Sequence, residues 1–114
     1  MKHFASLVSK LLKRIEVRGD SMAPSFNNGD WLLFYTGTGR WRSNSLIGKV
    51  VLIEQSPHLL LVKRVLRVNS SNTGEKTYWV EGDNKSASTD SRNWGEVTSN
   101  KIIGVLLLRY HRSK

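Results

Sequence analysis

Short runs of apolar, β-branched and aromatic residues, separated by turn-forming residues, most constrain how this chain can fold. Such runs are typical of β-strands, and several of them in succession predict a small, mainly β barrel or sandwich. A chain of 114 residues has room for one compact domain. We expect strands at residues 30–35, 48–54, 58–68, 77–81 and 101–110.

The N-terminal segment carries a different pattern. Apolar residues recur there at a spacing of three and four, which predicts a short amphipathic helix over residues 1–16. This helix would either pack on the domain that follows, residues 17–114, or lie on a membrane surface with its basic side chains facing the lipid headgroups. From residue 15 a short strand is expected to lead into the next turn. No apolar run approaches the ~20 residues that span a bilayer, so we expect no transmembrane segment and a cytoplasmic protein.

The composition excludes several kinds of site. The chain has no cysteine, which rules out disulfides and thiolate-bound metals, and its three histidines are scattered along the sequence. We therefore expect no metal and no cofactor. The net charge of +9 indicates an acidic partner such as a nucleic acid, an anionic membrane or an acidic protein segment, unless the basic residues at the two ends serve only solubility.

Ser21 and Lys63 are the first candidates for chemistry. Ser21 lies in the turn RGDSMAPSFNNGD, residues 18–30, and Lys63 lies in the middle of an apolar strand. Burial lowers the pKa of a lysine, and a neutral lysine can act as a general base. A serine hydroxyl needs such a base to become a nucleophile. The structural alternative is a lysine whose stem is buried while its amine reaches solvent.

Residues 82–95, GDNKSASTDSRNWG, form a predicted loop rich in hydroxyl and charged side chains. Its candidate site residues are Ser88, Asp90 and Arg92. In most loops such side chains bond the local backbone or form surface ion pairs. No single one of these elements identifies a site, but their order and combination do.

Three blocks of the sequence, taken in order, resemble the motifs of the signal peptidase I family of serine endopeptidases. They are GDSMAPSFNNGDWLLF at residues 19–34, GKVVLIE followed by LVKRVLRV at residues 48–68, and the loop at residues 82–95. The blocks cover nearly everything between residues 17 and 105. The resemblance implies a small antiparallel β-barrel or sandwich that forms a catalytic core, with a Ser-Lys dyad and no cofactor.

The resemblance also assigns roles to individual residues. It makes Ser21 the nucleophile that forms an acyl-enzyme, and Lys63 its general base. Ser88 matches a hydroxyl that orients the lysine amine. Asp90 and Arg92 match a salt bridge that supports the site.

The residues around the nucleophile are expected to meet the substrate. Met22 would form part of the substrate-binding surface, and Gly19 and Asp20 would lie at this surface or at the oxyanion hole. The backbone N–H of Ser21 would be an oxyanion donor. In many members of the family a serine stands at the position of Gly19 and adds a hydroxyl donor, which is missing here.

Members of this family carry a transmembrane anchor, and this chain shows none. In that respect it is most similar to a soluble branch, the maturation peptidases of nickel-type superoxide dismutase. The similarity implies a protein substrate, namely a precursor that loses an N-terminal propeptide, and no nucleic-acid partner.

Three other functions remain open at this point. The first is a signal peptidase held in peripheral contact with a membrane by the basic N-terminal helix. The second is the self-cleaving domain of SOS-type repressors, which has a related Ser-Lys fold, although the Ala-Gly or Cys-Gly pair that those proteins cleave does not occur here. The third is a basic β-barrel that binds nucleic acid, which rests on charge alone.

Overall fold

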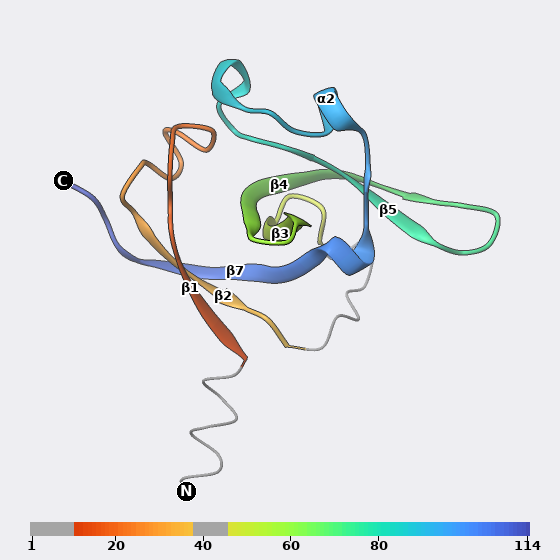
Figure 1. The fold of residues 1–114 in the computed structure, drawn as a ribbon, viewed down its shortest axis with the longest axis horizontal. Helices are drawn as coiled ribbons and strands as arrows, with labels where there is room; N and C mark the ends of the chain where they lie inside the picture. Colours follow the sequence, from red (N-terminus) through yellow and green to blue (C-terminus); the bar gives the residue numbers. More distant parts are fainter. Residues whose placement is uncertain (1–10, 38–45) are drawn as a thin grey trace, which may run out of the picture.

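The computed structural model describes residues 11–37 and 46–114, which form one antiparallel sheet of seven strands in the order β1-β2-β7-β3-β4-β5-β6. Figure 1 shows β3 and β4 near the centre, with β7 passing below them and β1 and β2 crossing β7 at one end. The strands are β1 (Leu12–Glu16), β2 (Trp31–Tyr35), β3 (Val50–Ser56), β4 (Leu59–Ser70), β5 (Lys76–Glu81), β6 (Val97–Thr98) and β7 (Ile102–His111). Short helices between β5 and β7 are η2 (Lys85–Ala87), α2 (Ser91–Trp94) and η3 (Ser99–Lys101).

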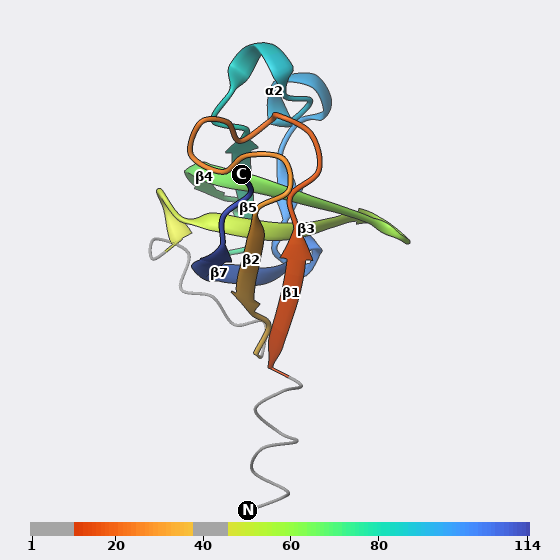
Figure 2. The same cartoon turned by 90° about the vertical axis from the view of Figure 1, so that its left-hand side faces the viewer.

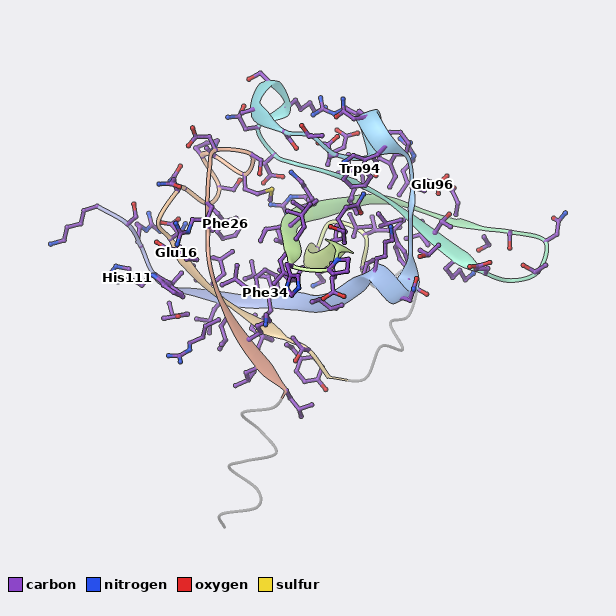
Figure 3. The ribbon with its side chains drawn as sticks, viewed as in Figure 1. Glu16, Phe26, Phe34, Trp94, Glu96 and His111 are labelled. Carbon is purple, nitrogen blue, oxygen red and sulfur yellow. The ribbon has the colours of Figure 1, made fainter. Side chains whose placement is uncertain are left out.

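The central strand β3 is buried on both faces. Because successive side chains of a strand point to opposite faces, β3 contributes to two hydrophobic clusters. Figure 3 shows Phe34 of the second cluster and Trp94, which packs against the first, on opposite sides of β3. The first cluster contains Leu46, Val51, Ile53, Val65, Tyr78, Val80, Val97 and Ile102, and the second contains Val17, Met22, Leu32, Phe34, Val50 and Leu52.

The mainly β prediction is confirmed. The five longer strands expected from the sequence correspond to β2, β3, β4, β5 and β7, with ends that differ by a few residues. The short strand β6 and the short helices were not expected, because their segments show no apolar periodicity.

The predicted N-terminal helix is wrong over its last five residues, which form β1 instead. Pairing with β2 supplies hydrogen bonds to the backbone of β1, and Ile15 packs against the second cluster. Tertiary pairing thus overrides a helical spacing of apolar residues. The rest of the predicted helix falls on residues 1–10, outside the described residues.

The sheet is strongly curved but does not close into a barrel. Within the described ranges its edges are β1 and β6, which do not pair with each other. The long strand β4 pairs with β3 through Leu59 to Arg64 but reaches its second neighbour β5 only from Arg64 onward. Among the described strands, the start of β4 therefore has a partner on one edge only, and the other edge faces the candidate site.

A buried carboxylate fastens the turn between β1 and β2 to β7. Asp30 is fully buried. Its Oδ1 accepts a hydrogen bond from the N–H of Ser113 at 2.7 Å. Its Oδ2 accepts hydrogen bonds from the N–H of Asn27 at 2.8 Å and from Nη1 of Arg109 at 3.2 Å. Arg109 also donates to the carbonyl of Ser25 at 2.9 Å. This carboxylate serves the structure of the turn.

We expect Asp30→Asn to lower the free energy of unfolding by roughly 2–3 kcal/mol at neutral pH, because the guanidinium of Arg109 loses its counter-charge. Burial by itself raises the pKa of Asp30, but the hydrogen bonds from Asn27, Ser113 and Arg109 outweigh it and hold that pKa below its usual value. A lowered pKa gives stabilisation that is present above the unfolded value of about 3.9 and is lost as the pH falls through the folded value.

Urea unfolding followed by tryptophan fluorescence measures this difference. The gap between wild type and Asp30→Asn should shrink as the pH falls below about 4. Glu75→Gln, a change at an exposed carboxylate in the β4–β5 turn, is the control and should leave stability near wild type. Equal stability of wild type and Asp30→Asn at pH 7 would contradict the assignment.

Candidate active site

The turn between β1 and β2 presents Ser21. Backbone hydrogen bonds close its base, from the N–H of Val17 to the carbonyl of Asp30 and from the N–H of Gly29 to the carbonyl of Val17, both at 2.8 Å. Met22 is buried in the second cluster and anchors the turn directly beside the serine. Ser21 itself is partly exposed, and its hydroxyl makes no hydrogen bond to any described residue.

Gly19 has a φ of +83°, in the left-handed region that strains residues with a side chain. Its N–H donates to Oδ1 of Asn28 at 2.8 Å. A serine in this conformation would strain the turn, which accounts for glycine at the position where the resemblance places a hydroxyl. Asp20 is exposed, and its carbonyl accepts the N–H of Ala23 at 3.1 Å. The predicted roles of Gly19 and Asp20 toward a substrate stay predictions.

Lys63 is buried on β4, with only 3% of its surface exposed. The alternative in which its amine extends into solvent is therefore wrong. Its Nζ donates to Oγ of Ser88 at 3.0 Å. Burial lowers the pKa of Lys63; the negative charge of Asp90 opposes this shift and the positive charge of Arg92 adds to it. The amine thus has the environment that favours a neutral, basic lysine.

Ser88, Asp90 and Arg92 form a connected network behind the lysine. The hydroxyl of Ser88 donates to Oδ2 of Asp90 at 2.6 Å while it accepts from Lys63. Arg92 donates two hydrogen bonds to the same carboxylate, from Nε at 2.9 Å and from Nη2 at 3.0 Å. Asp90 is also the N-cap of α2, in a capping box with Asn93, so the start of a helix fixes its position.

The carboxylate of Asp90 is fully buried and stays ionised. Burial by itself raises its pKa, but hydrogen bonds from Arg92, Ser88 and the N–H of Gly82 outweigh burial and hold that pKa well below its usual range. A fixed negative charge therefore lies one hydroxyl away from the amine of Lys63, and not in direct contact with it.

Residues 82–84 join the serine turn to the lysine strand, and the sequence alone assigned no role to them. Asp83 pairs with Arg64, the neighbour of Lys63, through two hydrogen bonds of 2.9 and 2.8 Å. The N–H of Asn84 donates to the carbonyl of Ser21 at 2.9 Å. The only sequence signal was the Gly-Asp-Asn start of the third block. In both views the turn and the segment with η2 and α2 lie at the same end of the molecule, above β4 (Figure 1 and Figure 2).

Ser21 and Lys63 line the same cavity, of about 110 Å³, between the end of β1 and the start of β4. Its walls are otherwise largely apolar. The lining residues are Ile15, Glu16, Val17, Arg18, Ser21, Met22, Leu60, Leu61, Val62 and Lys63. A larger open hollow, of about 690 Å³, is lined by Arg14, Trp31, Tyr110 and His111 and contains none of the predicted site residues. We assign the site to the smaller cavity, because it holds the serine and the buried amine together.

Among residues 11–37 and 46–114 no group of histidine, cysteine, aspartate or glutamate side chains is arranged to hold a metal ion. None of the helices in the same part of the chain is long and apolar enough to cross a membrane.

Comparison with known proteins identifies the family. The family described as signal peptidase, peptidase S26, matches residues 66–111. The mitochondrial ATP-independent inner membrane protease subunit 1a of Arabidopsis thaliana is 31% identical over 119 residues, in an alignment that covers 87% of this chain and 70% of that protein. The chain belongs to the signal peptidase family, peptidase S26. It is accordingly a peptidase, a hydrolase of signal peptidase type.

Membership in the S26 family confirms the coarser part of the resemblance and favours a peptidase over a nucleic-acid-binding barrel or a repressor domain. The matched range of this S26 peptidase contains Ser88, Asp90 and Arg92, and it begins after Lys63. The roles of individual residues therefore stay predictions that rest on geometry.

Gly82 is packed where a side chain has no room. A Cβ atom at this position would overlap the side chain of Ser88 and lie 2.5 Å from the carbonyl oxygen of Ser21. We expect Gly82→Ala to lower peptidase activity by roughly 100-fold or more, because it pushes the serine turn and the lysine-orienting hydroxyl apart. The measurement is kcat/KM on a cleavable peptide, with thermal unfolding recorded beside it.

The control is Gly74→Ala. Gly74 also lies at a turn, with a positive φ, but nothing lies near its Cβ position and it is distant in sequence from the site. This change should cost about 1 kcal/mol of stability and leave kcat/KM near wild type. Full activity in Gly82→Ala would show that the packing of this glycine does not set the site geometry.

Proposed function

We propose that this S26 peptidase is a serine endopeptidase in which Ser21 is the nucleophile and Lys63 the general base. The observation that carries the proposal is the amine of Lys63, buried in the wall of the cavity that Ser21 lines and held by the hydroxyl of Ser88. A buried amine with a lowered pKa can accept a proton that an exposed lysine could not accept at neutral pH.

In the first half of the reaction the neutral amine of Lys63 takes the proton of the Ser21 hydroxyl as Oγ attacks the peptide carbonyl carbon. A C–O bond forms, and the carbonyl oxygen carries the negative charge of the tetrahedral intermediate. The resulting ammonium of Lys63 gives its proton to the leaving nitrogen, and the C–N bond breaks. An ester between Ser21 and the N-terminal part of the substrate remains.

In the second half a water molecule replaces the departed amine. Lys63, neutral again, takes one proton of the water as its oxygen attacks the ester carbonyl carbon. The C–O bond to Ser21 then breaks, and Lys63 returns the proton to Oγ. The two products are a carboxylate and an amine, and both side chains are restored.

The apolar walls of the cavity and the fixed position of Ser88 support this chemistry. The apolar walls limit the solvation of the amine, and Ser88 holds it in one orientation. The hydrogen bonds from Ser88 to Asp90 and from the N–H of Gly82 to Ser88 keep the Ser88 hydroxyl in place. Hydrogen bonding in such sites commonly tightens when substrate binds, so a free hydroxyl on Ser21 suits the state without substrate.

We infer that the substrate is a precursor protein that loses an N-terminal segment. One candidate is the propeptide of a nickel-type superoxide dismutase, which rests on the resemblance to the soluble branch of the family alone. The second is a signal peptide cleaved at a membrane surface. The Arabidopsis relative is named an inner membrane protease, and this name favours the second candidate.

The experiment incubates the chain with each precursor, with the signal-peptide precursor embedded in liposomes. N-terminal sequencing of the products then shows whether the chain is an endopeptidase and which of the two precursors it cleaves. Ser21→Ala and Lys63→Met should each lower kcat/KM by roughly 10⁴-fold or more, because the nucleophile and its base act as a unit. Methionine fills the space of the lysine stem, so Lys63→Met should remain folded.

The matched control is Lys49→Met, at an exposed lysine, and it should keep wild-type activity. Full activity in purified Lys63→Met would exclude the lysine base. Cleavage of neither precursor by the wild-type chain would exclude both proposed substrates.

The pH profile tests the protonation state of Lys63. Activity requires the neutral amine, so kcat/KM should rise as the pH increases through the lysine pKa and fall in acid. The charge of Arg92 lowers that pKa and neutralises Asp90, so Arg92→Gln should raise the pKa and move the acid limb to higher pH. An acid limb that stays at its wild-type pH or moves to lower pH would contradict this electrostatic account. Arg67→Gln is the control for a general loss of positive charge, and its acid limb should stay at the wild-type pH.

A further inference from the structure

Asn84 contacts the backbone on both sides of Ser21. Its own N–H donates to the carbonyl of Ser21 at 2.9 Å. Its side-chain Nδ2 donates to the carbonyl of Asp20 at 3.0 Å. One residue of the third block thus holds the peptide group that precedes Ser21 and the peptide group that follows it.

Holding these two carbonyls determines the orientation of Ser21. A peptide group is planar and trans, so the carbonyl of Asp20 and the N–H of Ser21 lie in one plane and point in opposite directions. Two hydrogen bonds to the Asp20 carbonyl, from the Asn84 amide and from the N–H of Ala23, therefore set the direction of the Ser21 N–H. With the following peptide group held as well, both backbone dihedrals of Ser21 are restrained, and so is the direction of its Cα–Cβ bond.

The side chain of Asn84 is itself oriented. Oγ of Ser86 donates to its Oδ1 at 3.1 Å, which places the amide nitrogen on the side of Asp20. The carbonyl of Asn84 accepts the N–H of Ala87 at 3.0 Å, within the first turn of η2. The position of Asn84 is also set by Asp83, which is fixed to Arg64 on β4.

The N–H of Ser21 is available to a ligand. It donates to no acceptor in the described part of the chain, and Ser21 lines the cavity that holds the amine of Lys63. Position 19 is a glycine in a conformation that disfavours a side chain, so no hydroxyl from that position can share the task.

We propose that Asn84 is a positioning residue for the oxyanion hole: its side-chain amide aligns the Ser21 N–H with the oxygen that becomes negative in the tetrahedral intermediate. This inference rests on the proposed function, because it assumes that Ser21 is the nucleophile. Loss of one oxyanion donor lowers kcat by about 10²–10³-fold. A donor that is misaligned but still present should lower kcat by roughly 10- to 100-fold.

The test compares wild type with Asn84→Ala and Asn84→Asp. Asn84→Asp keeps the size of the side chain and the oxygen that Ser86 binds, and it loses the amide donor. In both variants kcat should fall roughly 10- to 100-fold while KM stays within about threefold, because the interaction acts on the transition state. The acid limb of the kcat/KM profile should stay at its wild-type pH, since Asn84 does not touch the network around Lys63.

A second measurement separates alignment from general damage. A peptide aldehyde with the sequence of the cleaved substrate forms a tetrahedral adduct with Ser21 and needs the oxyanion donor, whereas the cleaved product peptide does not. Both variants should bind the aldehyde at least about 10-fold more weakly and the product peptide within about twofold of wild type. Asn69→Ala, which removes an amide donor to Glu96 on the distal part of the sheet, is the control and should change neither affinity.

The outcomes distinguish this inference from the proposed function. If Ser21→Ala is inactive and both Asn84 variants keep wild-type kcat and aldehyde affinity, the positioning role is wrong and the serine mechanism stands. If the aldehyde and the product peptide weaken equally, Asn84 contributes to substrate binding and the inference is again wrong. Unfolding of both variants in a thermal scan would also overturn it, because Asn84 would then support the fold and not the alignment of one N–H. Failure of wild type to cleave any precursor would count against the proposed function itself.

Discussion

The buried carboxylate of Asp90 is the interaction on which the rest of the site depends. A buried charge is costly unless it is paired and hydrogen-bonded, and Asp90 meets this demand with the hydroxyl of Ser88, the N–H of Gly82 and the guanidinium of Arg92. Each partner belongs to a different part of the site. Satisfying one carboxylate therefore brings the end of β5, the loop hydroxyl and the start of α2 into a single arrangement.

Lys63 is subject to two opposing requirements, and the hydroxyl of Ser88 meets both. The amine must be held in place, yet a direct ion pair with Asp90 would favour its charged form and raise its pKa. With Ser88 in between, the amine donates to a neutral hydroxyl at 3.0 Å while the carboxylate stays one hydrogen bond farther away. Burial of the amine then dominates, and the pKa of Lys63 falls.

Much of the fold and the main members of the site follow from the sequence. The apolar runs that became β3, β4 and β7 were identifiable because their residues pack on the clusters described above. The N-terminal helix prediction was wrong at Leu12, because a local spacing of apolar residues does not decide between a helix and a paired strand, and pairing with Tyr35 does. Of the expected barrel or sandwich, the barrel does not close, because closure depends on how the edges of the sheet meet, and local patterns do not encode this.

The sequence by itself determined five of the strands, the three motif blocks and the residue types on which the candidate chemistry depends. Only the tertiary structure decided that the amine of Lys63 is buried, that it meets Ser88, and that Asn84 holds the backbone around Ser21. The physical reason is distance along the chain. These contacts join segments that are 25 to 64 residues apart, and their hydrogen bonds and desolvation exist only after the sheet has formed.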